Sequence, residues 1–182
     1  MKIINPFIEG LLVIQPQVYT DERGYFYEAF RADILQKYGL KVEFVQDNFS
    51  KSKKNTIRGL HYQVGNNAQG KLCQAIMGKV LDVAVDIRFN SSTFGKYYKH
   101  ELSEENHTII WIPPGFAHGF AALSDEAVFM YRCTAYYSKE DERSILYNDP
   151  DLNIDWQIEN PLVSEKDKNA KRFKNIDRDF TM

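Results

Sequence analysis

The sequence predicts an all-β protein, and three observations lead to that prediction. Segments with apolar side chains at every second position follow one another along most of the 182 residues, which is the pattern of half-buried strands. Short turn sequences rich in Gly, Asn, Asp and Pro separate these segments. Helical periodicity is convincing at one place only. Many short strands with few helices favour a sandwich or barrel, and within that class we expect a jelly roll.

The predicted elements follow in order from these patterns. Turns are expected at DERG, VGNNAQG, MGK, FNSSTFG and PPGFAHG. A helix is predicted for RADILQKYG, where Gly39 suits the C-terminal end, and a weaker one for SEKDKNAKR. Nine segments rich in Val, Ile, Phe and Tyr are predicted as strands: 7–14, 24–30, 42–49, 56–63, 71–77, 79–89, 96–102, 107–112 and 126–137.

Length and composition set limits on organisation and partners. We expect one domain over 1–182, with a charged, partly helical C-terminal tail from about residue 157. Because 23 basic residues nearly balance 25 acidic ones, nothing indicates nucleic acid or membrane as a partner. The start of the chain lacks a signal-peptide core, and Cys73 and Cys133 have neither zinc-site nor disulfide spacing. These features predict a cytoplasmic protein with two buried thiols.

The segment RGLHYQ places an arginine and a histidine in an otherwise apolar strand. In a regular strand Arg58 and His61 point to opposite faces. They can serve one site only if Gly59 permits a bulge, or if Arg58 lies at the end of the strand. Taken alone, His61 is equally well explained as a core histidine bonded to a carbonyl group.

Two carboxylates lie on one face of the strand predicted at 79–89. Leu81, Val83, Val85 and Ile87 form its apolar face, so Asp82 and Asp86 project from the other face among small residues. Because an unpaired buried carboxylate is costly, this pattern favours the lining of a cavity. A solvent-facing sheet surface is the alternative.

Aromatic and polar side chains share a face in three further strands. Tyr131 and Tyr137 project the same way, and a phenol can donate a proton or stack on a ring. On a straight strand their Cα atoms would be about 20 Å apart, so both could reach one carbon only if the strand bends.

Phe26 with Glu28, and Gln46 with Asn48, suit the wall of a wet, aromatic pocket. Ordinary core or surface filling gives the same pattern.

Two motifs leave alternatives open. PPGFAH, ending at His118, has the spacing of the second cupin motif, in which the histidine binds a metal. The first cupin motif needs His-x-His, but the chain has His61-Tyr62-Gln63, so we expect no metal. In SEKD, Asp167 fits a variant capping box begun by Ser164. A carboxylate that orients a histidine is the other interpretation.

Eight successive blocks of the sequence carry a joint signal: DERGYFYEAF, FVQDNFSKSKKNTIRGLHYQ, QGKL, GKVLDVAVDIR, STFGKY, WIPPGFAHGF, YRCTAYY and SEKD. Taken together, they resemble the dTDP-4-dehydrorhamnose 3,5-epimerase family. The resemblance extends in order from about residue 5 to 170. Within it, Cys73-Gln74 stands where many relatives have Val-Arg, and Ser138 stands where proline is common.

The resemblance implies a metal-free and cofactor-free homodimer with a cupin-type double-stranded β-helix, acting on dTDP-4-dehydro-6-deoxyglucose. His61 would be the general base, Asp167 its partner, Tyr131 the proton donor and Tyr137 a second tyrosine of the active site. Together with Phe26 and Asp82 from the patterns above, the positions expected to contact substrate are Arg23, Glu28, Gln46, Asn48, Arg58, Lys71, His118 and Glu142.

The expected chemistry explains these residue types. A C4 ketone acidifies the hydrogens on C3 and C5, and removing either gives an enolate with its charge on O4. Histidine suits the base, and Lys71 can stabilise the charge on O4. Inversion requires a proton from the opposite face of the ring, which a neutral tyrosine can supply. Arg23 and Arg58 suit a pyrophosphate.

Three alternatives stay open at this level. Relatives that act only at C3 or only at C5 share most of the blocks. A metal-dependent cupin enzyme would use His61, His118 and a carboxylate. A non-catalytic protein that binds nucleotide sugars is the third.

Overall fold

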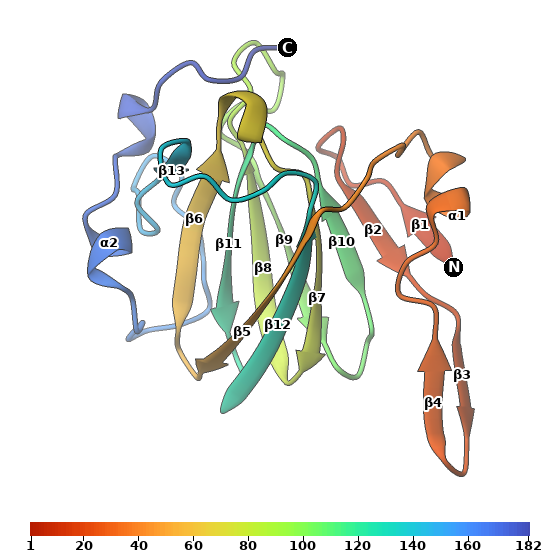
Figure 1. The fold of residues 1–182 in the computed structure, drawn as a ribbon. Helices are drawn as coiled ribbons and strands as arrows, with labels where there is room; N and C mark the ends of the chain where they lie inside the picture. The colour runs from red at the N-terminus through yellow and green to blue at the C-terminus, as the bar shows by residue number, and fades with distance from the viewer.

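The computed structural model of the chain describes residues 1–182, in which two antiparallel sheets face each other. The larger sheet has six strands in the order β1-β2-β10-β7-β12-β5 (Figure 1). Strands far apart in sequence are therefore neighbours. The bounds of its strands are β1 Lys2–Ile4, β2 Leu12–Gln15, β5 Gln46–Lys53, β7 Lys71–Met77, β10 Ile109–Ile112 and β12 Glu126–Cys133.

The second sheet has five strands in the order β13-β6-β11-β8-β9. Only short helices accompany the sheets: α1 Ala32–Gln36, α2 Glu165–Lys168 and the 3₁₀ turns Gly65–Asn67 and Phe173–Asn175. None of them has the length and apolar character needed to cross a lipid bilayer. The bounds of the strands are β6 Ile57–Gln63, β8 Lys79–Asp86, β9 Tyr97–Ser103, β11 Phe116–Ala122 and β13 Glu142–Ser144.

The main core lies between the two sheets. The inward faces of the strands contribute fully buried side chains such as Ile110 and Phe129 from one sheet and Val80 and Phe120 from the other. Phe120 and Phe129 stack across the interface with their ring centroids 4.3 Å apart. Two sheets packed face to face in this way confirm the prediction of an all-β jelly roll.

Each sheet also has a covered outer face. Leu81, Val83 and Val85 of β8 face outwards and are buried with Trp156 of the C-terminal tail, as the alternation in 79–89 predicts. Buried Asp149 anchors this tail because it accepts hydrogen bonds from the Arg172 side chain and the Phe173 backbone. On the six-stranded sheet, the segment around α1 packs over β2, β7 and β10.

One hairpin projects away from both sheets. Strands β3 (Val18–Asp21) and β4 (Gly24–Tyr27) pair only with each other and extend from the body of the molecule (Figure 1). The predicted DERG turn joins them. Its aromatic side chains Tyr19, Tyr25 and Phe26 are exposed, which is unusual for a group of large apolar rings.

The sequence prediction misplaces one central strand. PPGFAHG is predicted as a turn, but β11 begins at Phe116 and every residue of this strand is buried. A strand that is buried on both faces shows no alternation, and the two prolines and two glycines suggested a turn. The short strands β1, β3 and β13 are also absent from the prediction, and the strand predicted at 126–137 ends at Cys133.

Candidate active site

A cavity of about 330 Å³ opens between the two sheets beside α2. Its volume lies in the range of small-molecule sites. Side chains from β6, β7, β11, β12 and α2 line it, so segments more than 100 residues apart meet there. The lining includes six residues predicted to be functional: Arg58, His61, Lys71, His118, Tyr131 and Asp167.

A bulge in β6 brings Arg58 and His61 to the same side. His61 pairs with His118 of β11, but Phe120 pairs with Arg58, so β6 has one extra residue over this stretch. Gly59 lies at the bulge with φ +134°, and a Cβ atom there would lie 2.5 Å from the Gly119 Cα. Only glycine fits such a close approach of two backbones. The bulge at Gly59 that the sequence analysis required is therefore present, and Arg58 and His61 line the same cavity.

His61 and Asp167 form a close polar pair. His61 Nε2 lies 2.6 Å from Asp167 Oδ1, and Asp167 is buried. Ser164 caps α2 by accepting a hydrogen bond from the Asp167 backbone N–H, which fixes the start of this short helix. Both interpretations of SEKD therefore hold at once. The cap places the carboxylate, and the carboxylate meets the imidazole.

The pKa of Asp167 lies below its ordinary value. Burial raises the pKa, but the hydrogen bond and charge of His61, together with bonds from Ser164 and the Gly59 backbone, outweigh burial. The carboxylate is thus ionised at neutral pH and accepts from the imidazole. An aspartate in this position holds one tautomer and orientation of the histidine, which leaves the other ring nitrogen able to take a proton.

The opposite wall of the cavity carries a cation and a phenol. Lys71 of β7 and Tyr131 of β12 belong to the six-stranded sheet, whereas His61 belongs to the five-stranded one. Lys71 Nζ lies 5.8 Å from the centroid of the Tyr131 ring, and none of the ion pairs in the structure involves Lys71. Burial raises the pKa of Tyr131 to about 12, so its hydroxyl keeps its proton at neutral pH.

Behind His118 lies Asp82, which does not line the cavity. His118 Nε2 is 2.8 Å from Asp82 Oδ2, and Asp82 is completely buried. The expectation that Asp82 and Asp86 both line a cavity is wrong. Asp86 accepts hydrogen bonds from Arg88, Ser91 and Thr93 at the end of β8. Neighbouring residues in the sequence satisfy the Asp86 carboxylate, whereas His118 engages only one oxygen of Asp82, and neither carboxylate faces the cavity.

A second polar group lies at the rim. Tyr137 Oη donates to Glu142 Oε2 over 3.1 Å, and Lys166 Nζ lies 2.5 Å from the same carboxylate. Tyr137 follows the end of β12 and is exposed, outside the cavity lining. Because β12 ends at Cys133, the straight 20 Å separation expected of the two tyrosines does not apply. Lys166 lines the cavity.

Gln46 and Asn48 contact each other and do not reach the cavity lining. Gln46 Nε2 donates to Asn48 Oδ1 over 2.9 Å, and the Tyr137 backbone N–H donates to Gln46 Oε1 over 3.0 Å. This link holds the segment after β12 against β5. Their predicted contact with substrate stays a prediction.

Comparisons with known proteins agree with this site. The sequence profile of the dTDP-4-dehydrorhamnose 3,5-epimerase family matches residues 6–175. A curated dTDP-4-dehydrorhamnose 3,5-epimerase from Shigella flexneri is 51% identical over 181 residues, covering 99% of both chains.

The chain belongs to the dTDP-4-dehydrorhamnose 3,5-epimerase family.

Two further relatives show the range of that family. The crystal structure of the Legionella pneumophila dTDP-6-deoxy-D-glucose-3,5-epimerase in complex with dTDP-4-keto-L-rhamnose superposes with a TM-score of 0.93. It is 51% identical and covers 97% of this chain and 94% of its own. A Streptomyces dTDP-4-dehydro-6-deoxyglucose 3-epimerase is 34% identical over 94% of this chain and 88% of its own. The double epimerase is thus the more similar of these two.

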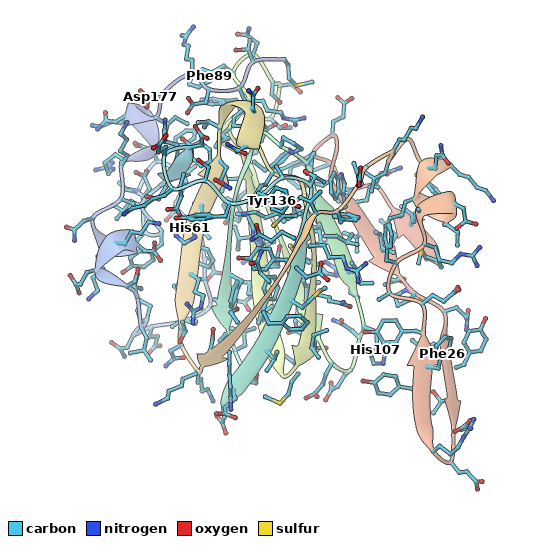
Figure 2. All side chains as sticks on the ribbon, in the orientation of Figure 1. Phe26, His61, Phe89, His107, Tyr136 and Asp177 are labelled. Carbon is cyan, nitrogen blue, oxygen red and sulfur yellow. The ribbon has the colours of Figure 1, made fainter.

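Three residues predicted to contact substrate lie away from this cavity. Arg23 and Phe26 lie on the β3–β4 hairpin and Glu28 just after it, whereas His61 lies on β6 near α2; Figure 2 labels Phe26 and His61 on opposite sides of the molecule. The Arg23 side chain is 86% exposed and pairs with Asp21. Within one chain, the hairpin therefore does not reach the cavity that contains His61.

The structure does not assemble the ligand set of a metal-dependent cupin. The one group of three or more His, Cys, Asp and Glu side chains close enough to share an ion is Cys73, Asp82 and His118. His61 is not among them, because its ring meets Asp167 instead. The alternative that used His61 with His118 is not supported by this geometry.

Some cavity residues had little signal in the sequence. Lys166 lies in the SEKD block beside Asp167, where a charged helical residue is ordinarily read as solvent-exposed. Ser50 shares a face with Gln46 and Asn48, and its buried Oγ has no hydrogen-bond partner in the chain. Thr56 joins them at the end of the cavity. An interleaved polar face predicts that such residues are wet, but not which of them meet a ligand.

Proposed function

We propose that the chain epimerises dTDP-4-dehydro-6-deoxy-D-glucose at C3 and C5, giving dTDP-4-dehydro-L-rhamnose. The observation that carries this proposal is the placement of a His61–Asp167 pair and a protonated Tyr131 on opposite walls of one cavity, with Lys71 beside Tyr131. The similarity to the Legionella enzyme, whose structure holds dTDP-4-keto-L-rhamnose, supports the substrate class.

The proposed reaction begins with proton abstraction. His61 takes the proton from C3 or C5, and the C–H electron pair moves into the ring to give an enolate with its charge on O4. Asp167 stabilises the imidazolium that results. Lys71 is buried, and no carboxylate engages it, so its ammonium group can donate to O4 as the charge develops. In this buried site the ammonium group stabilises the negative charge on O4 more strongly than it would in water.

Reprotonation completes the inversion. Tyr131 donates its hydroxyl proton to the same carbon from the opposite wall, because it lies on the other sheet from His61. Solvent exchange then returns a proton to Tyr131 and removes one from His61. No electrons are gained or lost by the sugar and no group leaves. Side chains alone can therefore carry the reaction.

Nucleotide binding is proposed for the cations at the cavity mouth. The Arg58 side chain donates hydrogen bonds to Ser52 Oγ and to the Lys51 carbonyl. These two bonds fix its guanidinium group at the edge of the cavity. Lys166 of α2 also lines the cavity, and Glu142 pairs with its ammonium group. A fixed guanidinium suits a pyrophosphate better than a mobile one because less freedom is lost on binding.

We propose that the active form is a homodimer in which each hairpin completes the partner's cavity. The exposed aromatic rings of the hairpin, and its separation from its own cavity, support this arrangement. Arg23 and Phe26 would then contribute to a site with His61 of the other subunit. A closed twofold dimer allows both hairpins to exchange in the same way.

We also propose a cytoplasmic location, which accords with the two free thiols.

One experiment tests the reaction. The protein is incubated with the 4-keto sugar nucleotide in D₂O, and NMR follows deuterium at C3 and C5. We expect deuterium at both carbons and conversion to the L-configured product. Deuterium at C3 or C5 alone would identify a single-site epimerase, as in the Streptomyces relative. No deuterium at either carbon would overturn the proposed epimerisation.

A further inference from the structure

Three potential metal ligands meet in the interior directly behind the cavity. Cys73 of β7, Asp82 of β8 and His118 of β11 come from both sheets, and their ligand atoms all lie within 4.8 Å of one another. All three side chains are at least nine-tenths buried. His118 alone lines the cavity. The cluster is therefore reached from the cavity past the His118 ring.

One oxygen of the Asp82 carboxylate has no hydrogen-bond partner. Its Oδ2 atom meets His118, but Oδ1 is buried with no hydrogen-bond partner. An orphaned carboxylate oxygen costs free energy in the interior, so such an atom requires an explanation. Cys73 is the one member of this cluster from the six-stranded sheet. Its S–H is only a weak hydrogen-bond donor, so it does not satisfy the free oxygen of Asp82, but as a thiolate it can bind a metal. A cation between them would satisfy the free oxygen.

The distances suit a tetrahedral ion after small movements. His118 Nε2 lies 2.8 Å from Asp82 Oδ2 and 4.0 Å from Cys73 Sγ. Around Zn²⁺, with bonds of about 2.0–2.3 Å, ligand atoms are about 3.3–3.6 Å apart. The first contact would lengthen and the second would shorten, each by about half an ångström. The Cys73 and Asp82 ligand atoms, which lie within 4.8 Å of each other, would come to the same separation.

We propose that Cys73, Asp82 and His118 form a binding site for a thiophilic divalent cation such as Zn²⁺ or Cd²⁺. The fourth position of the ion would face the cavity and hold a water molecule. Thiolate, imidazole and carboxylate together select such ions over Mg²⁺, which takes oxygen ligands. This site is separate from the His61–Asp167 pair.

Binding releases one proton. The Cys73 S–H gives its proton to solvent, and the neutral His118 carries its proton on Nδ1 so that Nε2 can bind the metal.

Occupation of the site would inhibit the proposed epimerisation. The ion takes the Nε2 atom of His118 from Asp82 and adds a water molecule to the floor of the cavity. Its positive charge would also lie near Lys71, which is two residues from Cys73 on β7 and therefore on the same face of that strand. Both changes disturb the place where O4 of the sugar is expected. The metal thus acts as an inhibitor that enters through the active site.

The test measures binding directly, on the full chain after treatment with a chelator. Cd²⁺ is titrated by calorimetry and by the ultraviolet charge-transfer absorption of a Cd²⁺–thiolate bond. We expect one Cd²⁺ per chain with the thiolate band, and no binding of Mg²⁺. Cys73→Val should remove the band and weaken Cd²⁺ by at least about 100-fold, since loss of a mere supporting partner costs about 10–100-fold. Cys133→Ser is the matched control and should bind like the wild type.

A second variant and an activity assay complete the test. Asp82→Asn is nearly isosteric and should weaken Cd²⁺ by at least about 10-fold while keeping the thiolate band at saturation. Zn²⁺ should inhibit epimerisation in the wild type, and Cys73→Val should need at least about 100-fold more Zn²⁺. The proposal is overturned if the wild type gives no thiolate band, or if Cys73→Val binds Cd²⁺ as the wild type does. Because binding is read without substrate, this outcome is independent of the proposed reaction.

Discussion

His61 Nε2 lies 2.6 Å from Asp167 Oδ1, although the two residues are 106 positions apart in the chain. The cap at Ser164 sets the position of the aspartate, and the Gly59 bulge sets that of the histidine. Two separate backbone devices therefore converge on one hydrogen bond. The catalytic proposal depends on this convergence, and the first prediction tests it.

His61→Asn should abolish deuterium exchange at both C3 and C5. Asparagine keeps a polar group of similar size but cannot take a proton at neutral pH, so neither carbon loses its hydrogen. The affinity for dTDP should stay within a few fold, because the base contributes little to binding the nucleotide. NMR in D₂O and calorimetry with dTDP measure the two effects. Exchange that persists at either carbon would reveal another base.

Asp167→Asn should reduce stability in a pH-dependent way. The folded chain depresses the pKa of Asp167, so the ionised form contributes stability above the ordinary value of about 3.9, and this contribution is lost as pH falls through the folded value. At pH 7 we expect a loss of about 1–3 kcal/mol in the free energy of unfolding. Urea unfolding at several pH values measures it. The difference from wild type should shrink below about pH 4; a constant difference would contradict the assignment.

Most of the fold could be predicted because its strands are amphipathic. Alternation in β8 separated Leu81 and Val83 from Asp82 correctly. The same rule failed for β11, because both faces of that strand are buried and no alternation remains. Periodicity detects a boundary between core and solvent. It cannot detect a strand that has no such boundary.

The site was predictable in its residue types but not in its assembly. Local pattern could not distinguish a place in a capping box from a catalytic role for Asp167. In the structure its backbone N–H donates to the capping Ser164 while its carboxylate meets His61. The position of Arg23 depends on where a hairpin projects, which no local pattern encodes. The free Oδ1 atom of Asp82 depends on contacts across three strands. Such long-range relations appear only when the sheets are packed.

Arg58→Ala should weaken the binding of dTDP by about 10- to 100-fold. The change removes charge-assisted bonds to phosphate, each worth about 1.5–3 kcal/mol. Lys54→Ala is the matched control, since Lys54 is an exposed cation nearby in the sequence that pairs with Asp125 outside the cavity. Calorimetry with dTDP compares the two. Equal affinities for both variants would place the pyrophosphate elsewhere.

Mixing two inactive variants tests the exchange of hairpins between subunits. If Arg23 serves the partner's site, a heterodimer of His61→Asn and Arg23→Ala has one site with both wild-type residues. Random reassociation of equal amounts makes half of the dimers mixed, and each mixed dimer has one intact site. About a quarter of all sites in the mixture then contain both wild-type residues. Activity is measured at a substrate concentration where the Arg23→Ala homodimer is nearly inactive. Activity that stays at the sum of the two homodimers would show that Arg23 serves its own chain or none.

Tyr131→Phe should separate proton removal from inversion. Burial raises the pKa of Tyr131 to about 12, so the wild-type phenol is a proton donor throughout the neutral range. Phenylalanine keeps the ring that packs beside Phe129 and removes only the hydroxyl. His61 can still take a proton and return a deuteron on its own side.

The expected result is therefore deuterium at C3 and C5 with retained configuration, and little conversion to the inverted sugar. Tyr137→Phe is the control, because Tyr137 is exposed at the rim and its hydroxyl bonds to Glu142. It should still invert both carbons, since Tyr131 supplies the proton. NMR of the recovered sugar reports label and configuration together. If Tyr131→Phe inverts fully and Tyr137→Phe does not, the donor is Tyr137, and the rim must close over the sugar before the proton is returned.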